Sequence, residues 1–428
     1  MTAQKPKLAM YWAASCGGCE IALANIHEAI LEVDAHFNFM FCPCLLDTKK
    51  KDIEALPDGD IFLTLFNGAL RTEENLEMAE LLRRKSRIFV AFGSCAATGG
   101  IPALANHHGI ASVLETAFCA LPGIDNTERL IPGTRCQVPD GKLELPAFLS
   151  RVLAAHEAVT VDYTMPGCPP EPEQIIAVVR HVASGAPLPP SGSLIGCSDR
   201  AVCDECAREK RTKLAPRLVR PFEAVPEPGW CLVEQGFSCL GIATRGGCHA
   251  LCPAANMPCT GCYGPLDRMA DPGATALAAL AAAVDPGSAA GTDEAALHAR
   301  LKNALSGVAD PLGSFYRYSL AETAVADRAK EDEPRANASP STPLPAWRGM
   351  ARSRSSSTMP ARSRRHISRS LNCAASNRSA SAGRPKRCQT SPTASAGSVL
   401  RRTTWRPSRR WMQPTAQSVF RQPGASVS

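Results

Sequence analysis

Short apolar runs alternate with amphipathic stretches through the first 185 residues of the chain. Runs of strand length predict β-strands over residues 8–14, 37–42, 61–66, 88–92 and 159–163. Apolar positions at helical spacing predict α-helices over residues 20–33, 73–84 and 173–183. Alternating strands and helices are typical of an α/β domain, so we expect residues 1–185 to form a parallel sheet with helices on both faces.

The pattern changes after residue 185. Residues 186–202 are rich in Pro, Gly and Ser and predict a linker. Residues 203–330 begin with an irregular, cysteine-rich stretch and continue into an Ala-rich, helical one. The cysteine-rich stretch contains eight thiols, at Cys203, Cys206, Cys231, Cys239, Cys248, Cys252, Cys259 and Cys262. We therefore expect a second domain that is organised around its cysteines.

Four further cysteines occupy a common position relative to the predicted strands. Cys16 and Cys19 form a CGGC motif after the first strand, Cys95 follows the strand at 88–92, and Cys168 follows the strand at 159–163. The carboxyl ends of parallel strands meet at one edge of a sheet, where binding sites form. These four thiols are therefore expected to share one pocket.

Twelve thiols in three groups of four indicate metal binding, because thiolates are the soft ligands that iron–sulfur clusters require. Two alternatives stay open at this point. The pairs at Cys203/Cys206 and Cys259/Cys262 are also compatible with zinc sites, and a lone CxxC such as the first one occurs in redox disulfides. Cys42 and Cys44, which end a predicted strand, are expected to be core residues.

Charge and composition narrow the class of protein. The chain has 428 residues, 19 of them Cys, and a net charge of +7. Residues 334–428 contain 18 of the 47 Lys and Arg residues and no acidic one, so residues 1–333 keep 29 basic against 40 acidic residues. Nucleic-acid binding would therefore depend on the tail alone. The sequence shows no export signal and no apolar run of membrane-spanning length, which predicts a cytoplasmic protein without a membrane span.

Three motifs together resemble a known family. SCGGCE after the first strand, GSCAATGG after a later one and MPGCPP after the last are similar to the small subunits of [NiFe] hydrogenases and to the related cluster-bearing 20 kDa subunit of complex I. Complex I relatives carry adjacent cysteines where this chain has Ser15 and Cys16, which favours hydrogenase. The later cysteine motifs resemble the cytoplasmic, methyl-viologen-reducing (F420-non-reducing) group.

This resemblance implies a flavodoxin-like first domain and an electron-transferring subunit with three [4Fe-4S] clusters. It places the cluster nearest nickel on Cys16, Cys19, Cys95 and Cys168, the next on Cys248, Cys252, Cys259 and Cys262, and the farthest on Cys203, Cys206, Cys231 and Cys239. Glu20, next to a ligand cysteine, is a candidate for tuning that cluster or passing protons. The implied partners are a nickel-carrying large subunit, an iron–sulfur adaptor and a heterodisulfide reductase; the alternative is a complex I-like subunit without hydrogenase activity.

The basic tail has a second interpretation besides disorder. Codons chosen for residues 346–353 and 393–406 read, in one shifted frame, as LEGHGKI and RICGVCPEAHHMA. Both strings resemble the start of the large, nickel-carrying hydrogenase subunit, in the expected order. We therefore interpret residues 334–428 as an out-of-frame extension into a downstream gene.

Overall fold

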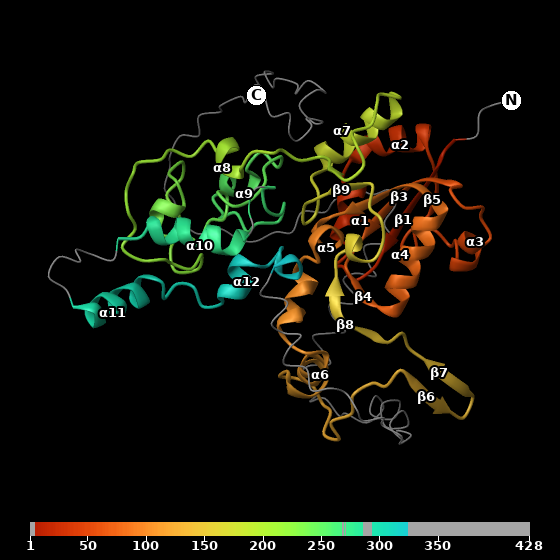
Figure 1. The fold of residues 1–428 in the computed structure, drawn as a ribbon, viewed down its shortest axis with the longest axis horizontal. Coiled ribbons are helices and arrows are strands. Elements are labelled where there is room, and N and C mark those ends of the chain that lie inside the picture. Colours follow the sequence, from red (N-terminus) through yellow and green to blue (C-terminus); the bar gives the residue numbers. More distant parts are fainter. Residues whose placement is uncertain (1–4, 268, 270, 286–292, 324–428) are drawn as a thin grey trace, which may run out of the picture. The chain divides into compact units, whose positions relative to one another are not determined.

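The computed structural model describes residues 5–267, 269, 271–285 and 293–323 (Figure 1). The predicted tail, residues 334–428, lies outside these ranges. The chain divides into two units, and the described part of the second unit is residues 136–143. These residues supply most of a two-stranded sheet formed by β6 (Arg135–Val138) and β7 (Gly141–Glu144).

A six-stranded sheet, parallel throughout, organises the first unit, with strand order β10-β9-β5-β3-β1-β2. Its strands are β1 (Lys7–Trp12), β2 (Asn38–Phe41), β3 (Ile61–Asn67), β5 (Ser86–Phe92), β9 (Tyr163–Met165) and β10 (Ser193–Leu194). Counted within this sheet, the first five strands follow the order 2-1-3-4-5 of flavodoxin-like folds. The predicted fold class is confirmed.

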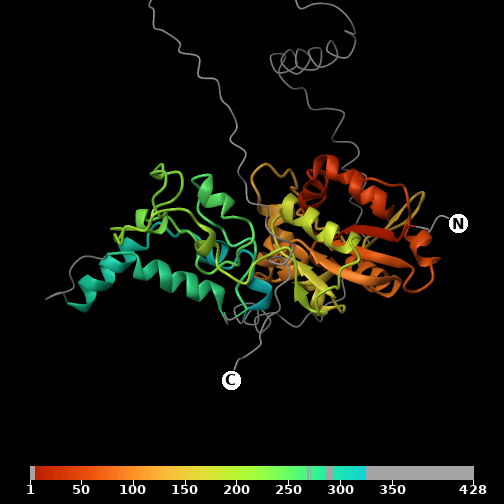
Figure 2. The same cartoon turned by 90° about the horizontal axis from the view of Figure 1, so that it is seen from above.

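Helices cover both faces of the sheet because neighbouring strand residues point to opposite sides. Leu8 and Met10 of β1 pack with α1 (Gly18–Ala24), α2 (Ile30–His36) and α7 (Pro172–Ala183). Ala9 and Tyr11 pack on the other side with α3 (Lys50–Glu54), α4 (Glu73–Lys85) and α5 (Ser94–Thr98). Figure 2 shows α7 beside α2, where Arg180 donates to both carboxylate oxygens of Glu32 at 2.8 and 2.6 Å.

Three local predictions differ from the structure. The helix predicted over 20–33 is interrupted after Ala24 by the short helix η1 (His27–Ala29), where His27 adopts a left-handed φ of 53°. The strand predicted over 159–163 begins only at Tyr163, where it pairs with Val90. The segment predicted as a linker contributes β10, which extends the sheet by pairing with β9.

Short elements lie outside the main sheet. β4 (Leu70–Thr72) follows β3 and pairs antiparallel with β8 (Phe148–Leu153). Between β5 and β9 lie β8 and the helical segments η2 (Ile101–His107), α6 (Ile110–Glu115), η3 (Thr116–Ala120) and η4 (Ala155–Glu157). The sequence pattern did not predict these elements, which have three to seven residues each.

The cysteine-rich stretch contains little regular structure. Its elements are α8 (Val202–Glu205), η5 (Val233–Gln235) and α9 (Leu251–Ala254), followed by α10 (Pro272–Ala282), α11 (Glu294–Ala304), α12 (Pro311–Phe315) and η6 (Leu320–Glu322). The helices within the described residues are all too short or too polar to cross a membrane.

The aromatic core of the sheet gives a first testable prediction. Phe66 is completely buried, and its ring centroid lies 5.3 Å from that of Phe89 and 5.6 Å from that of Tyr11. Phe66→Ala is expected to lower the free energy of unfolding by about 3–5 kcal/mol, measured by anaerobic urea denaturation. Leu45→Ala, at a side chain 69% exposed, is the control and should change it by less than about 0.5 kcal/mol. Equal effects would contradict this packing.

Candidate metal centre

Four thiols gather at the carboxyl edge of the sheet. Cys16 follows β1, Cys19 lies in the first turn of α1, Cys95 lies in α5 directly after β5, and Cys168 follows β9. Burial raises the pKa of Cys19, and the charges of the other three thiols raise it further. Burial also raises the pKa of Cys95 to about 12, again with Cys168 and Cys16 adding to it. The structure therefore brings together all four predicted residues, which we name quartet A.

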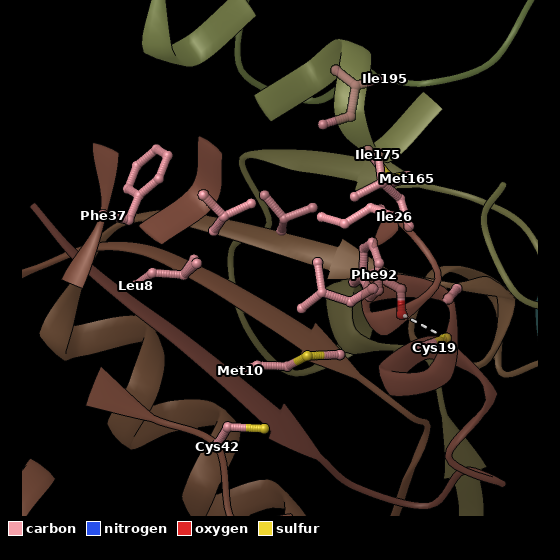
Figure 3. Close-up of a cluster of buried hydrophobic side chains, with 14 of the residues drawn as sticks. Leu8, Met10, Cys19, Ile26, Phe37, Cys42, Phe92, Met165, Ile175 and Ile195 are labelled. Atoms are coloured by element: carbon pink, nitrogen blue, oxygen red, sulfur yellow. Dashed lines mark hydrogen bonds between the residues drawn. The ribbon is translucent and has the colours of Figure 1, made fainter. Parts of the chain in front are cut away.

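Two glycines allow the loops to approach quartet A. Gly93 has a φ of +87°, and a Cβ at this position would collide with the Cys19 sulfur. A Cβ at Gly100, where φ is +53°, would lie 3.0 Å from the Cys95 sulfur. The Cys19 sulfur occupies the space beside Gly93, and its thiol donates to the Phe92 carbonyl oxygen at 3.8 Å, as Figure 3 shows. Only glycine fits this close contact between backbone and sulfur.

Gly93→Ala is therefore expected to displace the Cys19 sulfur and to reduce the iron content of the purified protein. Because one displaced ligand of four weakens the whole site, we expect a loss of about tenfold in cluster occupancy. Gly109→Ala is the matched control, since its backbone φ is −62° and nothing lies within 4 Å of the added methyl group. Iron analysis of both variants is the measurement, and full iron in Gly93→Ala would contradict the prediction.

Glu20 lies beside quartet A and is not a freely solvated side chain. Its Oε1 accepts a hydrogen bond from the Asn67 side-chain amide, and its Oε2 is buried without a partner among the described residues. Burial raises the pKa of Glu20, while the Asn67 hydrogen bond lowers it. The carboxylate is thus held at the same edge of the sheet as quartet A, since its charge also raises the pKa of Cys19.

The eight later cysteines affect one another's pKa, and the Cys259 thiol is affected by both Cys239 and Cys248. Burial raises the pKa of Cys203 to about 12, and the other thiols that raise it are Cys239, Cys206 and Cys231. Burial is also the main cause that raises the pKa of Cys262. The thiols of Cys259, Cys248 and Cys252 raise this pKa further. The structure thus brings thiols of the octet close to one another, and their division into two sets of four stays a prediction. We name them quartet B (Cys248, Cys252, Cys259 and Cys262) and quartet C (Cys203, Cys206, Cys231 and Cys239).

Hydrogen bonds connect the quartets in the order A, B, C. The Ser94 hydroxyl, next to Cys95 of quartet A, donates to the carbonyl oxygen of Cys262 in quartet B. A backbone hydrogen bond from Cys168 acts on the Cys262 thiol and lowers its pKa against the larger effect of burial. The backbone N–H of Cys259 in quartet B donates to the Cys239 sulfur of quartet C at 3.3 Å. Quartet B therefore lies between the other two.

Sequence analysis missed the polar residues that fasten the cysteine-rich stretch to the sheet. Tyr263 is buried, and its hydroxyl donates to Gln174 at 2.5 Å and accepts from the Glu171 backbone N–H at 3.2 Å. Ser94 also accepts a hydrogen bond from the Gly167 backbone N–H at 3.2 Å. Both Tyr263 and Ser94 are next to a quartet cysteine in the chain, which is the signal that could have identified them.

Cys197 lies outside the three quartets. Burial raises its pKa to about 12, and the neighbouring groups that shift this pKa are Arg245, Asp267, Asp199 and Glu205. Its surroundings are thus charged side chains, in contrast to the thiol neighbours of quartet A.

The donor set of each quartet fits an iron–sulfur cluster. Within the described residues, no three Cys, His, Asp or Glu side chains lie close enough together to hold a single metal ion. A [4Fe-4S] cluster takes four cysteine thiolates, one on each iron. Each quartet supplies four thiols, which is the type and number of donors that such a cluster needs.

Comparison with known proteins identifies the class. A family model described as NADH ubiquinone oxidoreductase, 20 Kd subunit, matches residues 16–182. The F420-non-reducing hydrogenase iron-sulfur subunit of Archaeoglobus profundus is 40% identical over 280 residues, covering 64% of this chain and 87% of that protein. The corresponding F420-non-reducing hydrogenase subunit of Methanothermobacter marburgensis is 33% identical over 336 residues, covering 77% of this chain and 99% of that protein.

A third relative is the NAD-reducing hydrogenase HoxS subunit delta of Cupriavidus necator, which is 30% identical over 184 residues, with 43% of this chain and 81% of that protein covered. The chain is thus a subunit of an oxidoreductase complex of the hydrogenase class. Within that class, it belongs to the family of iron–sulfur subunits of F420-non-reducing hydrogenases. The resemblance predicted from the motifs is confirmed.

Proposed function

We propose that this chain is the electron-transferring small subunit of a [NiFe] hydrogenase and that quartets A, B and C each hold one [4Fe-4S] cluster. The observation that carries the proposal is the linear order of the quartets, joined by the contacts of Ser94 with Cys262 and of Cys259 with Cys239. Clusters bound there would pass single electrons along the chain of sites. Hydrogen itself would be cleaved on a nickel-carrying large subunit.

The residues around quartet A support a docking site for that large subunit. Cys16 is exposed. The Trp12 indole packs against the neighbouring Gly17, and its nearest ring carbon lies 3.2 Å from the position that a Cβ would take there. Trp12 is 42% exposed and Ile21 is 61% exposed. Exposed apolar side chains that border a buried site mark protein interfaces. A partner that covers them would also exclude water from quartet A.

The chain's own residues would set the electronic properties of each site. Burial of Cys19, Cys239 and Cys259 keeps water from the sulfur ligands. The N–H of Cys259 that donates to the Cys239 sulfur stabilises negative charge there and would raise the reduction potential of quartet C. The negative charge of the Glu20 carboxylate would lower the reduction potential of quartet A. Electrons would leave from quartet C toward an iron–sulfur adaptor and a heterodisulfide reductase.

The test is anaerobic co-purification of the chain with a co-expressed [NiFe] hydrogenase large subunit. We expect a brown complex that contains nickel and iron and reduces methyl viologen with hydrogen. The match to the complex I 20 Kd subunit model supports a second candidate, an electron-transfer subunit without hydrogenase activity. An iron-rich, nickel-free complex that reduces quinones but not viologen would favour this second candidate and overturn the first.

A further inference from the structure

A pair of thiols outside the quartets has a geometry of its own. Cys42 and Cys44 follow β2, separated by Pro43, and their sulfur atoms lie 3.2 Å apart. Cys42 is 1% exposed, as the sequence predicted for a core residue, whereas the same prediction for Cys44 is wrong because this side chain is exposed to solvent. The structure therefore places one accessible and one protected sulfur side by side.

The backbone fixes this arrangement. The N–H groups of Leu45 and Leu46 both donate to the Cys42 carbonyl oxygen, at 2.9 and 2.8 Å, and form a tight turn. The Thr48 hydroxyl closes the loop by donating to the Met40 carbonyl oxygen at 2.7 Å. Pro43 restricts φ between the two cysteines. A disulfide has an S–S distance near 2.05 Å, so the sulfurs need to approach by only about 1 Å.

The surroundings give the two thiols different roles. Figure 3 shows the Cys42 side chain within the apolar cluster that contains Met10 and Cys19. Burial raises the pKa of Cys42 to about 12, and the neighbouring Cys44 adds to this rise. Cys42 is therefore shielded from reagents in solution, whereas Cys44 can meet them. Such a pair is typical of an attacking cysteine with a resolving partner.

We propose that Cys42 and Cys44 form a thiol–disulfide pair that is oxidised by low-molecular-weight disulfides such as oxidised glutathione. The Cys44 thiolate attacks one sulfur of the glutathione disulfide, and one glutathione leaves as its thiol. The Cys42 sulfur then attacks the Cys44 sulfur, and its proton passes to the second glutathione, which leaves as its thiol. Two protein thiols become one S–S bond, and the two electrons and two protons end on two glutathione thiols.

This pair is independent of the proposed electron-transfer function, because neither thiol belongs to a quartet. The test incubates the anaerobic, cluster-loaded full chain with oxidised glutathione, alkylates the remaining thiols in acid and maps the peptides by mass spectrometry. Cleavage after Phe41 separates the pair from Cys16 and Cys19 in the map. In the wild-type chain we expect the peptide with both cysteines to be two hydrogen atoms lighter than its dithiol form, with no alkyl group and no glutathione attached.

Two variants test the order of the steps. In Cys42→Ser the glutathione adduct on Cys44 should accumulate at least about tenfold above the wild-type level, because the resolving sulfur is missing. In Cys44→Ser neither an adduct nor a disulfide should form, since Cys42 is buried. A stable adduct on wild-type Cys44, or a peptide that stays fully alkylated while the partly exposed Cys119 reacts, would overturn the proposal.

Discussion

Cys95→Ser is expected to reduce hydrogen-dependent viologen reduction by the assembled complex at least about a hundredfold. Cys95 lies in quartet A, and its thiol is close enough to Cys168 and Cys16 for their charges to raise its pKa. A serine hydroxyl is a harder ligand than a thiolate and ionises far less readily than a thiol, so it binds the iron of a cluster poorly. In the proposed function quartet A is the entry to the chain of sites, so its loss would interrupt electron transfer even when the other two quartets are intact. Viologen reduction and iron content, measured on the same preparation, check this result.

Cys197→Ser is the matched control for that experiment. Cys197 is also a cysteine with a pKa raised to about 12 by burial, but Arg245 and Asp267 surround it in place of thiols. This variant should keep the wild-type rate and iron content. A Cys95→Ser complex with full iron and an unchanged rate would contradict the assignment of quartet A, and a loss of iron in Cys197→Ser would add Cys197 to the ligands.

The first quartet could be predicted from sequence because its members share a topological position. Each follows a strand, and strands of one parallel sheet end at the same edge, so the prediction needed only the strands and their direction. It held although the last strand begins at Tyr163, later than expected. The division of the octet into quartets B and C stays a prediction, because the Cys259 thiol is affected by Cys239 as well as by Cys248.

Contacts between distant parts of the chain could not be predicted. Tyr263 and Gln174 are 89 residues apart, and no local pattern shows that the phenol of one reaches the amide of the other. The buried position of Glu20 depends on Asn67, which a different strand supplies. The exposure of Cys44 depends on the turn after β2. Local periodicity reports which residues share an element, whereas these features depend on which elements become neighbours.

Removing iron from the folded protein is expected to unfold the cysteine-rich stretch and to leave the parallel sheet intact. The stretch has a small cluster of six buried residues, two of which, Cys239 and Cys259, belong to quartets. The buried residues Leu240 and Ala243 of this stretch join a second cluster, which is completed by α10 and α12. The helices α8 and α9 of the stretch have four residues each. By contrast, each face of the sheet has its own cluster of fifteen buried residues. When ligands contribute this much of a small core, metal binding supplies the free energy of folding.

Hydrogen–deuterium exchange before and after anaerobic treatment with an iron chelator measures this difference. We expect amides such as that of Leu240, which donates to the Cys259 carbonyl oxygen at 2.9 Å, to exchange at least about tenfold faster without iron. Amides of β3 and β5 are the internal control, because their parallel pairing involves no quartet residue and their protection should not change. Equal loss of protection in both regions would mean that the sheet also depends on bound iron, and unchanged protection in both would mean that the short elements around quartets B and C fold without it. Only a selective loss agrees with clusters that serve as the core of the second half of the chain.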